Sequence, residues 1–462
     1  MIPSLAVQQL TPETTVPDFW SARPEIAHIA AYAHARMCSR WAVLGVVLAR
    51  ITCTVPPNVV LPPIVGSDAS LNLFVAVVGR SGSGKSASME AAAAAVAAEG
   101  FPTVPLGSGE GISRSFAYKR MKDRELIWVE RSVLFTATEI DALAAVSGRQ
   151  GATVGPQMRE MFNGGELGFG YAAPEKRVIL PGHSYRASVV VGVQPGRAGA
   201  LLDDEAGGTP QRFLWMPGTD ATIPRYPEQA PDRFTPPRLR WPTPLQPIRV
   251  GGNEQEDDSP AESKGIGRRE ELWVDPIAVD AILGAAHARA TGTGEALDGH
   301  ALLVRLKVAA ALAILAGNKM VREDDWALAG IVMAVSDATR TEMQQELMKA
   351  RAALSERLGR AEGIKQATAE EIKGQQNRNR VLEQIMRKVN ASAPSEQNWR
   401  RSTLRKSFPS RDRDLFDEVF PNLFLSEADL QGAMTDNFID FAPEGDKGTG
   451  MSTPRRASQE RA

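Results

Sequence analysis

Short, nearly continuous apolar runs alternate with helix-forming segments between residues 71 and 217. Few polar residues interrupt these runs, which is typical of strands covered on both faces of a parallel sheet. The alanine-rich segment 86–99, which Gly100 ends, predicts a helix after the first run. This alternation predicts an α/β fold with a mostly parallel sheet. The predicted strands are residues 71–78, 126–129, 133–136, 187–193 and 213–216.

Helical spacing of apolar residues continues on both sides of this region. Residues 24–52 predict one or two helices that pack on the α/β core, and residues 273–345 predict a second helical region. Residues 346–380 are rich in Ala, Glu, Lys, Arg and Gln, which favours a long solvated helix. Residues 223–272 are first rich in proline and then polar and acidic, which indicates a linker.

A glycine-rich loop follows the first predicted strand. Glycines let the backbone curl so that several N–H groups point at one phosphate, and the helix that begins near Lys85 adds the positive end of its dipole. In such a P-loop, Lys85 reaches the β- and γ-phosphates of ATP and the Ser86 hydroxyl ligates Mg²⁺. The alternative is a chance glycine- and serine-rich loop. The residues expected to bind ATP are Gly79, Ser81, Gly82, Ser83, Gly84, Lys85 and Ser86.

Hydrolysis needs a group that holds the attacking water, usually a carboxylate at the end of a neighbouring strand. Glu139 follows the predicted strand 133–136 and is a candidate both for this catalytic role and for binding Mg²⁺. Many such ATPases have an aspartate where this chain has Thr138, so the roles of Glu139 and of the nearby Asp141 stay open. Glu139 is alternatively an ordinary acid at a helix N-terminus.

Two further polar residues are catalytic candidates. Gln194 ends the predicted strand 187–193, where its amide could orient the water, although Pro195 also makes an ordinary turn residue plausible there. Arg212 precedes the last predicted strand and could insert into the ATP site of a neighbouring subunit. A surface salt bridge is the alternative for Arg212. Arg159 and Arg186 are lesser candidates for the same role.

Composition gives the protein an ordinary globular character. Hydrophobic residues make up 43% of the chain and charged residues 23%, and the net charge is −2, so any contact with nucleic acid must come from a local basic patch. The two cysteines, Cys38 and Cys53, match no metal-ligand spacing and suit a reducing interior. We find no signal peptide and no membrane span, and we expect a cytoplasmic protein.

Several segments together resemble a poorly characterised family of P-loop ATPases found in actinobacterial phages, prophages and plasmids. Members are often fused to, or encoded beside, primase–polymerase domains, and they look like ring-forming helicase ATPases of the superfamily-3 and AAA+ kind. No primase–polymerase domain is visible here, so the resemblance implies an ATPase that acts alone or with a separate primase. The segments that carry the resemblance are residues 19–20, the glycine-rich loop, and residues 107–112, 139–143, 193–195 and 208–213.

The resemblance also implies a DNA-binding hairpin and a second nucleotide sensor. In related ring helicases a β-hairpin projects into the pore, and residues 167–172 and 177–180 could form its strands with 173–176 at the tip. Lys176, Arg177 and His183 would then contact DNA phosphates, unless this is a plain surface hairpin. Arg305, in the lid-like region, could reach the nucleotide, or it could be a snorkelling arginine at a packed interface.

A basic cluster marks the C-terminal region. Residues 381–442 suit a small winged-helix-like module whose second helix would be basic. Such charge suits docking on duplex DNA, although a solvated charged face is the plainer interpretation. The expected DNA contacts are Arg400, Arg401, Arg405 and Lys406, with Arg411 and Arg413 nearby.

These observations predict seven segments and one function. We expect an ATP- and Mg²⁺-using, DNA-dependent ATPase that forms a homo-oligomeric ring, a hexamer, and acts as a helicase in replication of a mobile element. A nucleotide-dependent switch or defence ATPase with a protein partner is the main alternative, and a small-molecule kinase is a weaker one. The predicted segments are an N-terminal helical region (1–66), the P-loop ATPase core (67–222), a linker (223–272), a helical lid (273–345), a charged helix (346–380), the winged-helix-like module (381–442) and a disordered tail (443–462).

Overall fold

The structure is a computed structural model with two compact units, Met1–Ala352 and Ala353–Ala462. Helix α10 (Glu323–Asn390) begins in the first unit and ends in the second. The structure describes residues 19–120, 126–139, 153–170, 178–204, 207–241, 269–293, 298–391, 398–399, 401–423 and 439–440.

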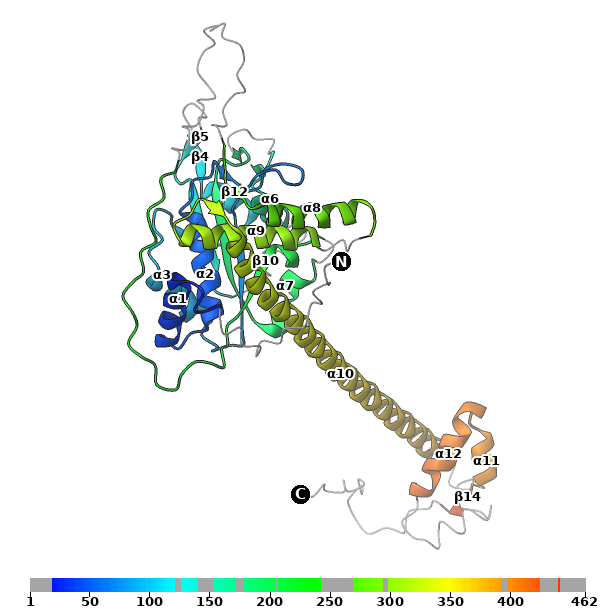
Figure 1. Cartoon of the computed structure of the whole chain (residues 1–462). Coiled ribbons are helices and arrows are strands. Elements are labelled where there is room, and N and C mark those ends of the chain that lie inside the picture. Colours follow the sequence, from blue (N-terminus) through cyan, green and yellow to red (C-terminus); the bar gives the residue numbers. More distant parts are fainter. Residues whose placement is uncertain are drawn as a thin grey trace, which may run out of the picture. The chain divides into compact units, whose positions relative to one another are not determined.

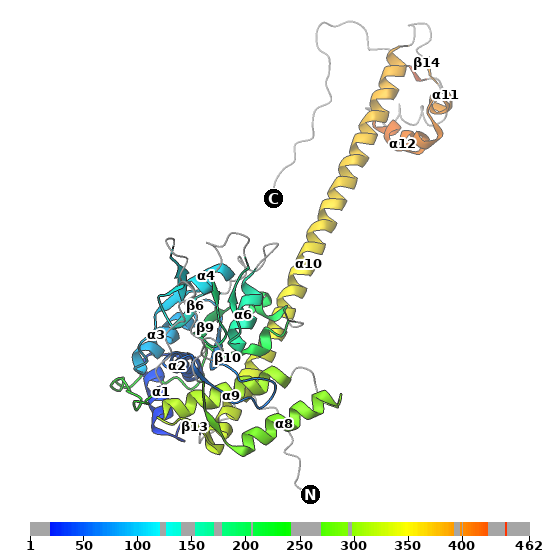
Figure 2. The same ribbon diagram turned by 90° about the horizontal axis from the view of Figure 1, so that it is seen from above.

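A five-stranded parallel sheet forms the centre of the first unit (Figures 1 and 2). Every pair of neighbouring strands is parallel, which confirms the predicted α/β class. The strand that precedes the glycine-rich loop lies between the strands predicted at residues 187–193 and 213–216. The order across the sheet is β10 (Phe213–Pro217), β2 (Phe74–Val78), β9 (Arg186–Val193), β6 (Ser132–Ala137) and β3 (Thr103–Pro105).

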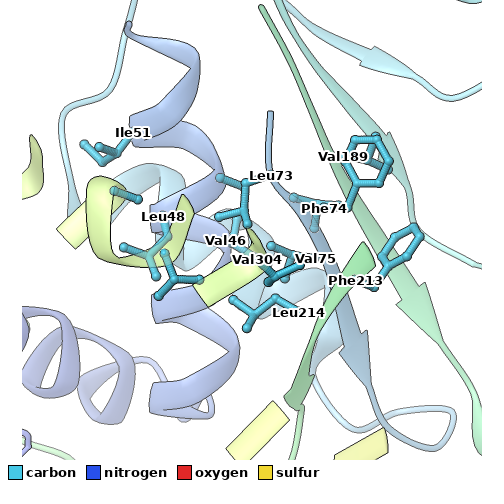
Figure 3. Close-up of a cluster of buried hydrophobic side chains, with 14 of the residues drawn as sticks. Val46, Leu48, Ile51, Leu73, Phe74, Val75, Val189, Phe213, Leu214 and Val304 are labelled. Carbon is cyan, nitrogen blue, oxygen red and sulfur yellow. The ribbon is translucent and has the colours of Figure 1, made fainter. Parts of the chain in front are cut away.

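Helix α2 (Arg40–Cys53) covers one face of this sheet. It contacts β2, β6, β9 and β10, and nearly all of its residues are buried. Gly45 allows this close approach, because a β-carbon there would lie 2.6 Å from Met216 Cγ and 3.1 Å from Val75 Cγ1. Figure 3 shows Val46 of α2 beside Val75 of β2. The continuous apolar character of both elements follows from this packing.

Helix α6 (Val154–Asn163) supplies the packing on the other face. Successive side chains of a strand point to opposite faces, so Phe74 points away from α2. The Phe74 ring lies 5.4 Å from the ring of Phe162 on α6 and 5.4 Å from that of Phe213, between centroids. The sheet is therefore covered on both sides, as its apolar strands predict.

The remaining helices of the first unit flank this core. Helix α3 (Lys85–Ala95) ends four residues earlier than predicted. The reason is that Val96 is extended and forms an isolated β-bridge with Phe234. Part of the predicted linker therefore packs along α3, while residues 242–268 lie outside the described residues. The other helices are α1 (Pro24–Ala35), α3 (Lys85–Ala95), α4 (Gly109–Arg114), α7 (Gly199–Leu202), α8 (Pro276–Ala290) and α9 (Asp298–Leu315).

Short strand pairs complete this unit. One of them, β7 (Leu167–Gly168) with β8 (Ile179–Leu180), is antiparallel and pairs the segments expected to form a hairpin. Its expected tip lies outside the described residues. The other pairs are β1 (Val59–Val60) with β11 (Glu270–Glu271), β4 (Ala117–Lys119) with β5 (Leu126–Trp128), and β12 (Trp273–Val274) with β13 (Met320–Val321).

The second unit has a small core of its own. Val381, Ile385 and Val389 of α10 pack against residues of α11 (Arg401–Lys406) and α12 (Arg413–Val419). The basic helix expected near residues 399–406 is therefore present as α11. An antiparallel pair of strands, β14 (Asn398–Trp399) and β15 (Ile439–Asp440), belongs to the same unit. The expected disordered tail lies outside the described residues.

Helix α10 differs from the sequence-based segmentation. The end of the expected lid, the charged helix and the first helix of the C-terminal module are one continuous helix of 68 residues. No proline interrupts residues 323–390, so no residue forces a break. Among the described residues, no helix has the length and apolar character needed to cross a membrane.

Candidate functional site

The loop 79–84 connects β2 to α3 at the carboxyl edge of the sheet. Gly82 and Gly84 have φ angles of +79° and +81°, a conformation that side chains other than glycine rarely adopt. A β-carbon at Gly79 would lie 2.1 Å from Ser83 Oγ, so a side chain at this position would displace the Ser83 hydroxyl. The Gly79 N–H donates to the Val193 carbonyl at 2.9 Å, which ties the loop to the neighbouring strand β9. The glycines therefore give the loop its curled shape.

Lys85 lies in the first turn of α3 and is buried, with 7% of its surface exposed. Its ammonium donates to the carbonyl oxygens of Gly79 and Arg80, both at 2.8 Å. Burial lowers the pKa of Lys85, and the nearby Glu139 carboxylate partly opposes this shift. A buried cation is thus held inside the curve of the loop.

The loop has donors that suit an anion. Ser83 Oγ is buried and has no hydrogen-bond partner among the described residues, although a buried hydroxyl ordinarily has one. The first N–H groups of an α-helix also lack partners within the helix, and they lie at the Gly84–Lys85 junction. Ser81 and Ser86 are exposed at the two ends of the loop. These donors fit the oxygens of a phosphate group.

Two neighbouring strands bring polar side chains to the same edge. Glu139 follows the end of β6 and Gln194 follows the end of β9, and Gln194 Nε2 donates to Glu139 Oε1 at 3.4 Å. Gly192 explains the close approach, since a β-carbon there would lie 2.2 Å from the Thr138 carbonyl and 3.6 Å from Lys85 Cε. Three of the expected catalytic residues, Lys85, Glu139 and Gln194, therefore lie together. Asp141 lies outside the described residues.

Sequence reasoning missed the contribution of helix α10. An open cavity of about 390 Å³ adjoins the loop, and α10 forms one of its walls. Glu346 Oε1 accepts from Lys349 Nζ at 2.9 Å, and Glu346 Oε2 lies 4.0 Å from Arg80 Nη2. The charged composition of this helix gave no sign that it meets the loop. The lining residues are Arg80, Ser81, Gln194, Pro195, Gly196, Glu346, Lys349 and Ala350.

Arg212 lies at the opposite edge of the sheet from the loop. It precedes Phe213, which pairs with Phe74 at the start of β2, whereas the loop follows the end of β2. The residue is 8% exposed, its Nη1 donates to the Gly207 carbonyl at 2.7 Å, and burial lowers its pKa. Its Nε is buried without a hydrogen-bond partner among the described residues. Arg212 therefore does not reach the ATP site expected in its own chain.

The two lesser arginine candidates have contacts that stabilise the fold. Arg186 is fully buried, and its guanidinium donates five hydrogen bonds, to the carbonyls of Val55, Pro56 and Val59 and to the side chains of Ser70 and Asn72. Arg159 forms an ion pair with Asp204, with Nη1 2.7 Å from Oδ2. Neither arrangement leaves the guanidinium free for a neighbouring subunit.

Arg305 is also distant from the loop. Its guanidinium donates to the Trp326 carbonyl at 2.9 Å and lies 3.9 Å from the Trp326 ring centroid. Trp326 and Glu346 share helix α10 and are about 30 Å apart at 1.5 Å per residue. The structure thus places Arg305 at a packed interface, which agrees with the alternative interpretation.

Three residues at or near the β7–β8 hairpin were expected to contact DNA. Lys176 and Arg177 lie outside the described residues. His183 is described, and its side chain is only 10% exposed, beside Asp68. Burial lowers the pKa of His183 to about 4, so it is uncharged at neutral pH. His183 therefore offers no positive charge to a DNA phosphate at neutral pH.

The basic helix α11 is partly neutralised within its own unit. Arg401 Nη2 lies 2.6 Å from Asp417 Oδ1, and Arg405 Nε lies 2.7 Å from Asp417 Oδ2. Lys406 is exposed, and Arg400 lies outside the described residues. Two of the four expected DNA-binding residues thus share one carboxylate.

No family model matches the chain, and a search of curated proteins gave no match. Among the described residues, no group of three or more His, Cys, Asp or Glu side chains could hold a metal ion.

Proposed function

We propose that the chain binds and hydrolyses ATP with Mg²⁺ at the β2–α3 loop, as a P-loop ATPase. The observation that carries this proposal is the meeting of Lys85, Glu139 and Gln194 at one edge of a parallel sheet, around a loop rich in anion-binding donors. A structural lysine alone would not require the glycines, the unpaired Ser83 hydroxyl and the acid–amide pair in the same place.

Different residues of the site would bind the phosphates and the Mg²⁺ ion. The loop N–H groups, Ser83 and Lys85 would hold the phosphates, and Ser86 and Glu139 would hold Mg²⁺ directly or through water. Mg²⁺, when bound, neutralises charge on the β- and γ-phosphate oxygens. Lys85 would exchange its bonds to the Gly79 and Arg80 carbonyls for bonds to phosphate, and anionic phosphate favours the charged form of this buried ammonium.

Glu139 and Gln194 would position the attacking water. A carboxylate accepts the proton of a water molecule, and an amide fixes its orientation by donating and accepting hydrogen bonds. The hydrogen bond between Gln194 and Glu139 aligns the two groups. Thr138 offers no charge in the position where an acid is common, so we expect slow turnover.

We further propose that DNA stimulates this activity and that the chain works as a ring, with a separate primase as partner. Arg212 is 8% exposed and donates to the Gly207 carbonyl, so this side chain would have to move to reach the ATP site of a neighbouring subunit. The β7–β8 hairpin and the exposed Lys406 of the winged-helix-like C-terminal unit would contact DNA.

The test is steady-state ATP hydrolysis with and without single-stranded DNA. We expect DNA to raise the rate and Glu139→Gln to abolish turnover in both conditions while ATP binding persists. A rate that DNA does not change would overturn the DNA-stimulated motor, and full activity of Glu139→Gln would overturn the catalytic assignment.

A nucleotide-dependent switch that acts on a protein partner is the second candidate. Thr138 and the pairing of Arg401 and Arg405 with Asp417 favour it, because the first suits slow turnover and the second weakens DNA contact. ATP binding without turnover, and without any effect of DNA, is the result that would support the switch.

A further inference from the structure

The middle of helix α10 has no packing partner among the residues that the structure describes. Every side chain from residue 348 to residue 373 is exposed. Four of them are large and aliphatic: Leu354 is 57% exposed, Leu358 62%, Ile364 69% and Ile372 53%. Single exposed aliphatic residues are common, but repeated ones along one helix indicate a surface that another helix covers.

This segment has little to stabilise it as an isolated helix. Gly359, Gly363 and Gly374 lie in its interior, and glycine is among the weakest helix formers. Along residues 353–377, all of which are described, the ion pair between Glu356 and Arg360 is the only one that the structure forms. Helices in proteins owe most of their stability to packing of an apolar face.

Three of the four exposed aliphatic residues fit a heptad repeat, and the fourth, Ile364, falls at a g position beside the seam. Leu354 and Ala361 occupy d positions, and Leu358 and Ile372 occupy a positions. The three glycines then fall at b, f and c, which face away from a coiled-coil partner. The polar seam residues Lys365 and Asn379 at a, and Thr368 and Gln375 at d, weaken such a seam but fix its register.

The charges beside the seam indicate what the partner is. Arg357 occupies a g position and Glu362 occupies the following e position. In a parallel, in-register pair of identical helices, each g residue faces the e residue five positions later on the other helix. Arg357 of one copy would therefore face Glu362 of the other, twice by symmetry.

We propose that residues 354–379 of α10 form a parallel, in-register coiled coil with the same segment of a second copy of this chain. The oppositely charged pair of Arg357 and Glu362 is complementary to itself in a parallel pair of helices, so a second copy is the occupant that these residues favour. The proposal does not depend on ATP binding, because the segment lies in the second unit and outside the candidate site.

Charge reversal in the full-length chain tests the pairing. Arg357→Glu or Glu362→Arg alone creates two like-charge pairs and should weaken self-association about tenfold, measured by sedimentation over a concentration series. The double variant Arg357→Glu/Glu362→Arg should restore it. The matched control is Glu356→Arg/Arg360→Glu, which reverses an outward-facing pair at f and c and should leave association unchanged.

Position-specific crosslinking gives an independent readout. Both native cysteines are buried, so one added cysteine is a clean probe. Under mild oxidation, Ala361→Cys at d should give a covalent dimer, whereas Ala367→Cys at the outward c position should not. Absence of the Ala361→Cys dimer, or failure of the double charge variant to restore association, overturns the proposal. The crosslink is specific to this seam, because association through other surfaces would not bring the two Ala361→Cys thiols together.

Discussion

Gly192 lies directly against the backbone of Thr138, at the point where strands β6 and β9 end. A β-carbon at residue 192 would lie 2.2 Å from the Thr138 carbonyl oxygen, closer than β-carbons approach oxygen atoms. The same β-carbon would lie 3.6 Å from Lys85 Cε. Because Gly192 has no side chain, the end of strand β6 can lie close to Lys85 of the glycine-rich loop.

Gly192→Ala should separate these groups. We expect the free energy of unfolding to fall by about 1–3 kcal/mol, as for other overpacked cores, and ATP affinity to fall with it. Gly284→Ala on α8 is the control, because a β-carbon at Gly284 meets nothing within 4 Å and Gly284 does not line the cavity beside the loop. Urea unfolding and titration with ATP measure both effects, and equal behaviour of the two variants would contradict the account.

Glu346 and Lys349 should affect nucleotide affinity in opposite directions. Both line the cavity beside the loop, so an anionic nucleotide would be repelled by one and attracted by the other. We expect Lys349→Ala to weaken ATP binding a few-fold and Glu346→Gln to strengthen it. High salt should shrink both effects, because the groups are near solvent. If neither variant alters ATP affinity, α10 does not contribute to the site.

His183 should make stability depend on pH. Burial lowers its pKa to about 4, against about 6.5 for the unfolded chain. The unfolded state therefore binds a proton first, and stability that is present above pH 6.5 is lost as pH falls toward 4. The charged groups around it are Asp68, which favours the protonated form, and Arg269, Arg186 and Lys307, which disfavour it.

His183→Asn is the variant that isolates this effect. Residue 183 has a φ of +57°, which asparagine tolerates better than most residues. Between pH 7.5 and pH 5, urea unfolding should show that the variant loses about 2 kcal/mol less stability than the native chain. Equal losses in the two proteins would show that His183 titrates normally.

Asp417→Asn should release Arg401 and Arg405 for other anions. If α11 contacts DNA, the variant should bind duplex DNA more tightly, with a salt dependence steeper by up to about two phosphate contacts. Glu418→Gln, which removes the partner of Arg378 on α10, is the control. Unchanged DNA affinity in a folded Asp417→Asn protein would exclude these two arginines from the interface.

Much of the first unit was predictable from local patterns. The strands β2, β6, β9 and β10 coincide with apolar runs because both faces of the sheet are covered, and the glycine spacing located the loop that β2 leads into. Strand order and the meeting of Glu139 with Gln194 were not predictable in this way, since they depend on pairings between segments distant in sequence.

Buried cations were the main failure of sequence reasoning. Arg186 was a candidate to reach a neighbouring subunit, but it is fully buried and bonded to neutral acceptors. Lys307 is equally buried and donates to the Asn72 and Phe162 carbonyls. A charged residue in a sequence normally indicates a side chain that is exposed to solvent. Only the fold reveals the carbonyl groups that take the place of water around a buried cation. The charged composition of α10 likewise indicated a solvated helix, so it gave no sign that α10 lines the cavity beside the loop.

Equilibrium binding of ATP with Mg²⁺, measured by titration calorimetry, tests the central claim most directly. The native chain and Lys373→Ala should both bind, since Lys373 is an exposed lysine of α10 outside the candidate site, whereas Lys85→Ala should bind about 100-fold more weakly or not at all. Native-like affinity of a folded Lys85→Ala protein would contradict the assignment of the β2–α3 loop as the phosphate site.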